Sequence, residues 1–506
     1  MNPTFQSVGI VGAGAMGQGI AQMAAQAGSS VVLFDLQPGA AERARAALSE
    51  TWQKLVDKSK IEAAQRAAML ERVSCAGALE ALSRCDLVIE AVVERLDVKQ
   101  KLFSDLEAIV SEQAVLATNT SSLSVTAIGS ALKRPGQLAG FHFFNPVPLM
   151  RVVEVIAGLK TAPAVCRQLT AFAREFGHTP VSAQDTPGFI VNHAGRGYGT
   201  EALRVAGERI ADFATIDRIL KDQMGFRLGP FELMDLTALD VSHPVMESIY
   251  RQYYDEPRYR PSVITAQRLA GGVVGKKVGD GFYAYKDGVA QVPSEPAPPQ
   301  VSELPPVWVS PKAARRAEIY QLLKNLGANI ETAQAPSANA LILVAPLGLD
   351  VTTLAAVERL DPTRTVGIDM MLEDAATKRR VLATNPATRP DMRDAAHALF
   401  ARDGKAVSVV RDSGGFVTQR VVATIVNIAA DMCQQGICSP KDLDVAVTLG
   451  LGYPMGPLAM GDKIGPTNVL EILFNMGTVY ADPRYRPSPW LRRRGALGLS
   501  LMHEEA

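Results

Sequence analysis

The sequence has no excess of charge of either sign, and it contains few cysteines. Its 506 residues include 52 Lys plus Arg and 52 Asp plus Glu, so the formal net charge is zero. Proteins that bind nucleic acids or membrane surfaces usually carry a basic excess, so neither kind of partner is expected. The five cysteines are odd in number, scattered and without metal-type spacing, which predicts neither a disulfide framework nor a metal site.

Long apolar runs are also missing. No uninterrupted apolar run reaches the ~18 residues that a membrane-spanning helix needs, and the chain enters a strand pattern almost at once. The hydrophobic content is 47%, and the length is far beyond one average domain. We therefore expect a soluble, cytoplasmic protein of two to four domains.

The first specific pattern is GIVGAGAMGQGIAQMAAQAGSSVVLFD at residues 9–35, which reads as strand, helix and strand. Gly12, Gly14 and Gly17 form G-x-G-x-x-G where the first strand meets the helix. Glycines there permit a tight turn, close approach of a pyrophosphate and close helix packing. Asp35 stands at the distance expected for an acid that binds a ribose diol, which favours NAD over NADP. The alternative is a glycine-rich turn in an unrelated α/β protein.

Several later strand patterns end in polar residues, as expected at the ligand-binding edge of a parallel sheet. Of the six histidines, only His142 lies among these strand ends. Glu154 follows after a turn with two prolines, so a hairpin-like return could bring its carboxylate to the imidazole. Such a pair suits a general base that removes a hydroxyl proton. The alternative for His142 is a histidine buried in the core without a catalytic role, and the alternative for Glu154 is a charged surface residue.

Five motifs in chain order carry a resemblance to a known family. GAGAMGQGIA, EAVVE, ATNTSSL, HFFNPVPLMRVVEVI and DTPGFIVN are similar to the L-3-hydroxyacyl-CoA dehydrogenase family over about residues 5–287. That family oxidises 3-hydroxyacyl-CoA to 3-oxoacyl-CoA with NAD. The resemblance implies an α/β Rossmann-type NAD-binding domain followed by an all-α helical domain.

The resemblance also implies site residues. His142 matches the catalytic base and Glu154 its partner, while Ser121 and Asn192 match residues that hold the substrate oxygen. Besides the three glycines, the matching NAD contacts are Asp35, Glu94, Lys99 and Asn145.

A charged helical pattern at residues 37–72 lies where the family has a CoA-binding helical hairpin. Lys54 and Lys58 are the candidates for contacting CoA, although the pattern does not decide which lysine would do so. Read from the residues alone, a solvated helical hairpin is the favoured interpretation of this segment, and only the resemblance turns it towards CoA binding.

The second half of the chain repeats the first. A proline-rich linker at residues 292–306 precedes it, and DSGGFVTQR then matches DTPGFIVNH, with Phe189 and Phe416 227 residues apart. The same shift relates Gly140 to Gly367. A register kept over this distance indicates a duplication.

The duplicated half has lost every catalytic residue. The shift of 227 takes His142, Glu154, Ser121 and Asn192 to Asp369, Val381, Gly348 and Gln419. Nearer its start the shift is 299, since Gly28 matches Gly327, and a deletion of 72 residues separates the two registers. There the three glycines of the fingerprint become Pro311, Ala313 and Arg316. We therefore expect one active site per chain, in the first half.

These patterns predict a domain plan. We expect an NAD-binding domain at residues 1–184, a helical domain at 185–290, a linker at 291–306, a degenerate Rossmann-like domain at 307–411 and a second helical domain at 412–506. Single-copy members of the resembled family dimerise through the helical domain. Two copies in one chain could therefore form an intrachain pseudo-dimer, with a homo-oligomer also open.

The substrate is left open between several classes. The length and degenerate half resemble bacterial enzymes of phenylacetate degradation that act on 3-hydroxyadipyl-CoA, and 3-hydroxybutyryl-CoA is the alternative. A sugar-acid dehydrogenase acting on a substrate such as gulonate, or a non-catalytic NAD-binding scaffold, would explain fewer of the motifs.

Overall fold

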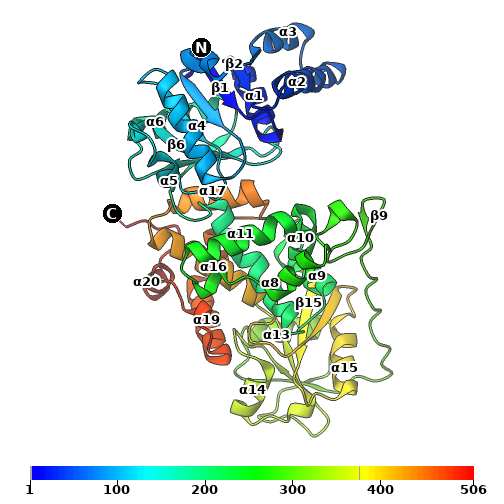
Figure 1. Ribbon diagram of the computed structural model, residues 1–506. Coiled ribbons are helices and arrows are strands. Elements are labelled where there is room, and N and C mark those ends of the chain that lie inside the picture. Colours follow the sequence, from blue (N-terminus) through cyan, green and yellow to red (C-terminus); the bar gives the residue numbers. More distant parts are fainter. Residues whose placement is uncertain (1–2, 375, 506) are drawn as a thin grey trace. The chain divides into compact units, whose positions relative to one another are not determined.

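The structure, a computed structural model, describes residues 3–374 and 376–505. The chain forms two compact units. Unit 1 comprises Met1–His193 and Gln435–Leu451, and unit 2 comprises Ala194–Gln434 and Gly452–Ala506. Unit 1 thus takes one short segment from the second half of the chain, which Figure 1 shows in orange beside cyan elements.

Unit 1 is centred on an eight-stranded sheet in the order β3-β2-β1-β4-β5-β6-β7-β8. All neighbouring strands are parallel except β6 and β7. The strands are β1 (Ser7–Val11), β2 (Ser30–Phe34), β3 (Val73–Ala76), β4 (Leu87–Glu90), β5 (Val115–Thr118), β6 (Leu138–Phe143), β7 (Val152–Ala157) and β8 (Thr179–Gln184). The central strands are buried along their length, as their continuous apolar runs predict.

Helices follow most of these strands. They are α1 (Ala15–Ala27), α2 (Ala40–Asp57), α3 (Ala63–Glu71), α4 (Leu96–Ile109), α5 (Val125–Gly129), α6 (Pro163–Glu175) and α7 (Val191–Ala194), with α17 (Pro440–Leu451) added from the second half. The strand order changes direction between β1 and β4, so the carboxyl ends of these strands form the edge where ligands bind in such sheets.

Unit 2 holds a second, smaller sheet in the order β12-β11-β13-β14-β15-β16, with β14 and β15 antiparallel. Its strands are β11 (Val307–Val309), β12 (Ile330–Glu331), β13 (Leu341–Val344), β14 (Thr365–Ile368), β15 (Arg379–Thr384) and β16 (Ala406–Arg411). Its helices are α13 (Arg316–Asn325), α14 (Val351–Glu358) and α15 (Pro390–Phe400).

The remainder of unit 2 is helical, apart from the short hairpin β9 (Tyr285–Lys286) and β10 (Val289–Ala290). The first-half helices are α8 (Arg196–Gly207), α9 (Phe213–Met224), α10 (Pro230–Thr237), α11 (Leu239–Gln252) and α12 (Val263–Ala270). The second-half helices are α16 (Thr418–Gln434), α18 (Pro457–Ile464), α19 (Pro466–Tyr480) and α20 (Pro489–Leu497).

The predicted duplication is confirmed. At the shift of 227, β14, β15 and β16 correspond to β6, β7 and β8, and the antiparallel pair recurs at the same place. Among the described residues of the second half, the sheet has no counterpart of β3 or β4, and α2, α3 and α4 also lack counterparts. The 72-residue deletion therefore removed the lysine-bearing hairpin and two strands, leaving a degenerate second copy of the α/β fold.

No helix in the described part of the chain combines the length and apolar character needed to cross a membrane. Within residues 3–374 and 376–505 there is also no group of three or more His, Cys, Asp or Glu side chains that could hold a metal ion.

Candidate active site

The predicted pairing of His142 with Glu154 is present at the carboxyl edge of the sheet in unit 1. His142 on β6 stands directly opposite Glu154 on β7 in the antiparallel register. The imidazole Nδ1 lies 2.5 Å from Glu154 Oε2, and both side chains are buried. With Nδ1–H donated to the carboxylate, the lone pair of Nε2 is left to accept a proton from a substrate hydroxyl.

The second oxygen of Glu154 is held by the main chain. The backbone N–H groups of Ile190 and Val191 donate to Glu154 Oε1 at 2.8 and 2.9 Å. These two residues belong to the GFIVN motif, so this motif fixes the carboxylate before it supplies Asn192. Sequence reasoning missed this role, because backbone donors leave no mark in residue type.

Ser121 and Asn192 are brought together at the end of β5 and the start of α7. Asn192 Nδ2 lies 3.5 Å from the main-chain oxygen of Ser121, and both side chains are half-buried. The Ser121 N–H donates to Glu94 Oε1 at 2.8 Å. The polar turn after β5 is thus tied to the loop after β4, which places donors next to each other at the sheet edge.

Glu94 organises this turn. Its Oε1 accepts hydrogen bonds from Thr120, Ser121 and Ser122, and its Oε2 lies 3.2 Å from Lys99 Nζ. Burial alone would raise the pKa of Glu94, but the Lys99 ammonium and these hydrogen bonds outweigh burial and lower that pKa to about 2. The carboxylate is therefore firmly ionised and holds the turn in place.

Lys99 is itself almost fully buried, with its side chain only 1% exposed. Its Nζ lies 2.5 Å from Glu90 Oε1 in addition to its contact with Glu94. Lys99 is thus buried against Glu90 and Glu94. The remaining predicted NAD contact, Asn145, follows β6 and is exposed.

The glycine-rich turn fits a dinucleotide. Gly12 has φ +101°, and a Cβ there would lie 2.5 Å from the Ala91 oxygen, so only glycine makes this turn. A Cβ on Gly17 would meet the Gly12 oxygen at 1.8 Å. A Cβ on Gly14, in contrast, would meet no protein atom within 4 Å. The space in front of Gly14, at the start of α1, is thus open for a pyrophosphate.

Asp35 directly follows β2 and lies beside this turn. Its carboxylate accepts the N–H of Ala13 at 2.7 Å and the N–H of Gln37 at 2.8 Å. Carboxylate oxygens can accept further hydrogen bonds, so Asp35 can also receive a ribose diol.

Lys54 and Lys58 lie at the carboxyl end of α2, and both are exposed. In the sequence, these lysines precede β3 and are far from His142 and Glu154. They form a basic end to the helix and are available to a phosphate.

The comparisons with known proteins decide the family. Residues 7–186 match the model of the 3-hydroxyacyl-CoA dehydrogenase NAD binding domain, and residues 188–285 and 415–500 match that of the C-terminal domain. The chain is 36% identical to 3-hydroxyadipyl-CoA dehydrogenase of Escherichia coli K12, over 97% of this chain and 98% of the relative. The chain belongs to the 3-hydroxyacyl-CoA dehydrogenase family.

Two further relatives match different shares of this chain. Human mitochondrial hydroxyacyl-coenzyme A dehydrogenase is 37% identical but covers only 55% of this chain, with 91% of its own length matched. A crystal structure of 3-hydroxybutyryl-CoA dehydrogenase from E. coli K12 has 34% identity and a TM-score of 0.84, covering 97% of this chain and 98% of its own. Single-copy and double-copy members of the family thus both resemble this chain.

The family fixes the activity. The protein is an NAD-dependent oxidoreductase of 3-hydroxyacyl-CoA, and NAD is its cofactor. The match to the C-terminal domain model at two places agrees with the duplicated helical segment found in the sequence.

The position equivalent to the dyad in unit 2 carries neither a histidine nor a glutamate. Asp369 takes the place of His142, and its Oδ1 accepts a hydrogen bond from Gln419 at 2.9 Å. Gln419 in turn accepts the N–H of Gly348 at 2.8 Å. Opposite Asp369 stands Val381, whose carbonyl oxygen accepts the Asp369 N–H. These groups hydrogen-bond to one another, and neither an imidazole nor a facing carboxylate stands at this place.

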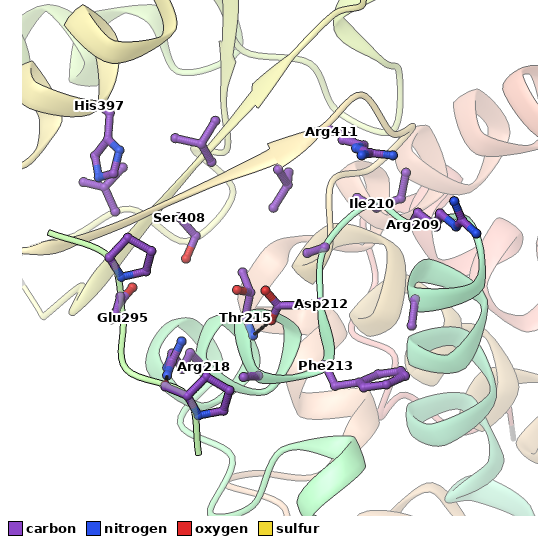
Figure 2. A pocket seen from close by; sticks show the side chains of 18 of the residues that line it. Arg209, Ile210, Asp212, Phe213, Thr215, Arg218, Glu295, His397, Ser408 and Arg411 are labelled. Atoms are coloured by element: carbon purple, nitrogen blue, oxygen red, sulfur yellow. Dashed lines mark hydrogen bonds between the residues drawn. The ribbon is translucent and has the colours of Figure 1, made fainter. Parts of the chain in front are cut away.

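Unit 2 contains a cavity of about 830 Å³ that includes none of the dyad residues. It lies between the loop leading into α9, strand β16, helix α15 and the linker (Figure 2). The labelled side chains around it are Arg209, Ile210, Asp212, Phe213, Thr215, Arg218, Glu295, His397, Ser408 and Arg411.

Proposed function

We propose that the substrate is 3-hydroxyadipyl-CoA, oxidised to the 3-oxoacyl thioester, as in phenylacetate degradation. The observation that supports this most is the similarity along 97% of the chain, degenerate half included, to a relative named for that substrate. The alternative is 3-hydroxybutyryl-CoA, the substrate for which the E. coli enzyme with the similar crystal structure is named.

A panel of thioesters distinguishes these substrates. NADH formation at 340 nm would be followed with the 3-hydroxyadipyl, 3-hydroxybutyryl and 3-hydroxyhexanoyl thioesters of CoA. The proposal predicts the highest kcat/KM for the adipyl ester. A clear preference for the butyryl ester would replace the proposed substrate while leaving the family activity in place.

We propose the following roles in the reaction. When bound, NAD would supply the acceptor for the hydride of C3 of the substrate. His142 Nε2 takes the proton of the 3-hydroxyl group, and Glu154 stabilises the imidazolium that forms, as its 2.5 Å contact with Nδ1 supports. Ser121 and Asn192 hold the developing carbonyl oxygen. The three glycines, Asp35, Glu94, Lys99 and Asn145 form the NAD site, Lys99 through Glu94.

We also propose that Lys54 and Lys58 bind phosphates of CoA. Their exposure at the end of α2 supports this role, and the described part of the degenerate half has no such helix. A sugar-acid dehydrogenase would need no such contact. Activity with free hydroxy acids such as gulonate, but with no thioester, would favour that alternative.

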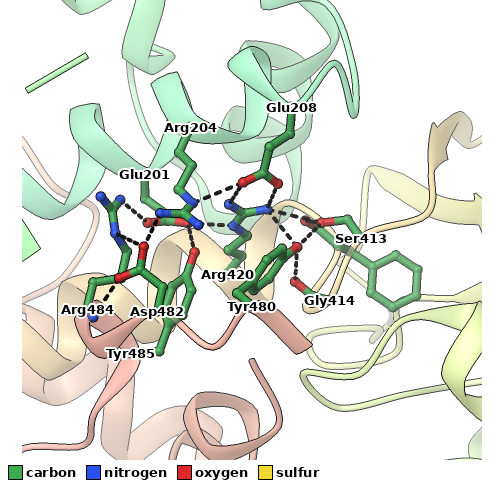
Figure 3. A network of polar contacts seen from close by, with 11 residues as sticks. Glu201, Arg204, Glu208, Ser413, Gly414, Arg420, Tyr480, Asp482, Arg484 and Tyr485 are labelled. Carbon is green, nitrogen blue, oxygen red and sulfur yellow. Dashed lines mark hydrogen bonds and ion pairs between the residues drawn. The ribbon is translucent and has the colours of Figure 1, made fainter. Parts of the chain in front are cut away.

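We propose that the two helical segments form an intrachain pseudo-dimer, with the domain plan at residues 1–184, 185–290, 291–306, 307–411 and 412–506. Within unit 2, α8 of the first segment packs against α16 of the second. Arg420 on α16 is fully buried, with its Nε 2.5 Å from Glu201 on α8 and its Nη1 2.7 Å from Glu208 (Figure 3). Buried ion pairs between two copies of a segment suit a permanent interface.

The neighbouring residues reinforce this pairing. Arg484 and the Tyr485 hydroxyl also contact the Glu201 carboxylate, and Arg204 pairs with Asp482 (Figure 3). Despite burial, which would raise it, the pKa of Glu201 is lowered by Arg420 and Arg484. The charged forms are therefore the stable ones, and loss of one partner would strand a buried charge.

Cleavage of the linker tests the pseudo-dimer. A protease site would be inserted into the largely exposed stretch at residues 297–303, and the cut protein would be analysed by size-exclusion chromatography. The proposal predicts that the two pieces elute together as one particle. Separate elution of the pieces in native buffer would contradict it.

We propose a cytoplasmic location. The scattered, odd number of cysteines supports it, because such a pattern is typical of proteins in a reducing compartment.

A further inference from the structure

Helix α17 comes from the degenerate half but belongs to unit 1. It packs against β7 and β8, the last two strands of the active sheet. Just before the helix, the Ile437 oxygen accepts the N–H of Gln184 at the end of β8, at 2.9 Å. The second half of the chain therefore supplies a structural element to the unit that carries the dyad.

The end of α17 meets the residues that hold Glu154. A Cβ on Gly450 would lie 3.0 and 3.1 Å from the two γ-carbons of Val191, and 3.5 Å from Val152 Cγ1. Val191 donates its N–H to Glu154 Oε1, and Val152 precedes Glu154 by two residues on β7. The strand that carries the carboxylate and one of its two amide donors thus pack against the same turn of α17.

The same contact is built into the other copy in the reverse direction. At the shift of 227, α17 corresponds to α9 and β7 to β15, and α9 packs against β15 in unit 2. Gly450 corresponds to Gln223 and Val191 to Thr418, and the Thr418 hydroxyl donates to the Gln223 side chain. In unit 2 a side chain bridges the gap, whereas in unit 1 glycine lets the helix touch Val191 directly.

We propose that α17 positions the catalytic dyad, with Gly450 as the positioning residue: the helix seats Val191, whose amide fixes the Glu154 carboxylate against His142. The degenerate half thereby contributes to the geometry of the dyad in unit 1, although its own equivalent of the dyad is lost. This inference rests on the proposed role of Glu154, and it assigns no contact between Gly450 and the substrate or NAD.

The first variant is Gly450→Val, which adds a branched side chain against Val191. A displaced carboxylate should lower kcat by about tenfold to a hundredfold, because small errors in catalytic geometry are costly. The KM for NAD should stay as in the wild type, and assays would be run well below the measured unfolding temperature of each variant. If Gly450→Val fails to fold, Gly450→Ala takes its place in the test. It adds only one methyl group, so its kcat should fall by a smaller factor.

Two matched variants separate positioning from stability. Val191→Ala in the Gly450→Val background makes room for the new side chain and should restore most of kcat. Gln223→Val disturbs the equivalent contact in unit 2 and should leave kcat unchanged, whatever it does to the unfolding temperature.

Wild-type kcat in folded Gly450→Val, or in Gly450→Ala where Gly450→Val does not fold, would overturn the proposal. A loss of kcat that Val191→Ala fails to restore would overturn it as well. Glu154→Gln is the reference: wild-type kcat in that variant would overturn the dyad itself, and the positioning role with it. A strong loss in Glu154→Gln beside full activity in Gly450→Val would overturn the positioning role alone.

Discussion

The dyad edge of the first sheet and its equivalent in the second sheet have the same backbone and different chemistry. In unit 1, His142 faces Glu154 across an antiparallel pair, and in unit 2, Asp369 faces Val381 across the corresponding pair. Asp369 is buried, which raises its pKa, and it is hydrogen-bonded to Gln419. Duplication preserved the strand pairing, while the side chains at the edge changed from reactive to mutually satisfied.

Both copies retain an aspartate that holds the start of a helix. Asp185 accepts the N–H groups of Val125 and Thr126 at the start of α5, and Asp412 accepts those of Val351 and Thr352 at the start of α14. Each carboxylate satisfies helix N–H groups that would otherwise lack partners. Such caps are kept in the copy that has lost the His142–Glu154 pair, because they stabilise the fold.

The sharpest test of this difference replaces one residue in each copy. His142→Gln removes the general base and should lower kcat by about 10²–10⁴-fold while NAD affinity stays near that of the wild type. Asp369→Asn, the matched change in unit 2, should leave kcat unchanged. Steady-state kinetics with a 3-hydroxyacyl-CoA thioester measures both, and equal losses in the two variants would remove the distinction between the copies.

The glycine turn offers a smaller effect. Gly14→Ala meets no protein atom, so the unfolding temperature should hardly change. Its methyl group stands where the pyrophosphate would approach, and loss of charge-assisted hydrogen bonds at ~1.5–3 kcal/mol corresponds to roughly 10–100-fold weaker NAD binding. Ala313→Gly, the equivalent change in unit 2, should create no NAD site. Isothermal titration with NADH checks both; unchanged affinity in Gly14→Ala would place the pyrophosphate elsewhere.

The Glu94 cluster lies in a region that the second copy has lost, and it should make unit 1 sensitive to acid. The folded-state pKa of Glu94 is lowered from about 4.5 to about 2. Its stabilising effect is therefore complete above the unfolded-state pKa and is lost as pH falls from about 4.5 through about 2. Since Glu94 is about one-third exposed, with 34% of its side chain accessible, solvent screening limits the effect to of order 1 kcal/mol.

Denaturant unfolding across this acidic range measures that effect, with Glu94→Gln as the comparison. The variant should lose less stability on acidification than the wild type. The same pH dependence in both proteins would show that Glu94 is not the group responsible.

The smallest effect is expected at the end of α2. Lys54→Ala and Lys58→Ala should each raise the KM for the acyl-CoA substrate a few-fold, as expected for exposed charge contacts of ~0.2–1 kcal/mol, with kcat unchanged. Lys133→Ala, another exposed lysine, is the control. A KM that does not respond to either substitution, or to added salt, would leave α2 as a solvated helix.

The sequence motifs anticipated much of the fold and the chemistry of the site. His142 and Glu154 are close in sequence and joined by a turn, so local pattern was enough to pair them. The repeat register predicted which strands recur and which residues the second copy has replaced.

Long-range contacts were beyond such reasoning. The Ile190 and Val191 amides that hold Glu154 carry no side-chain signature, and the Glu201–Arg420 pair joins residues 219 positions apart. The assignment of α17 to the active unit depends on how whole helices pack. Apolar periodicity predicts that a helix buries one face, but not which sheet it buries that face against.

The central claim is that the chain has one active site although it contains two copies of the fold. The number of NADH molecules bound per chain, measured by isothermal titration calorimetry, tests this most directly. One molecule per chain is expected, and the same number in Asp369→Asn. Two molecules per chain would contradict it, because they would show that the copy without the glycine fingerprint still binds the cofactor.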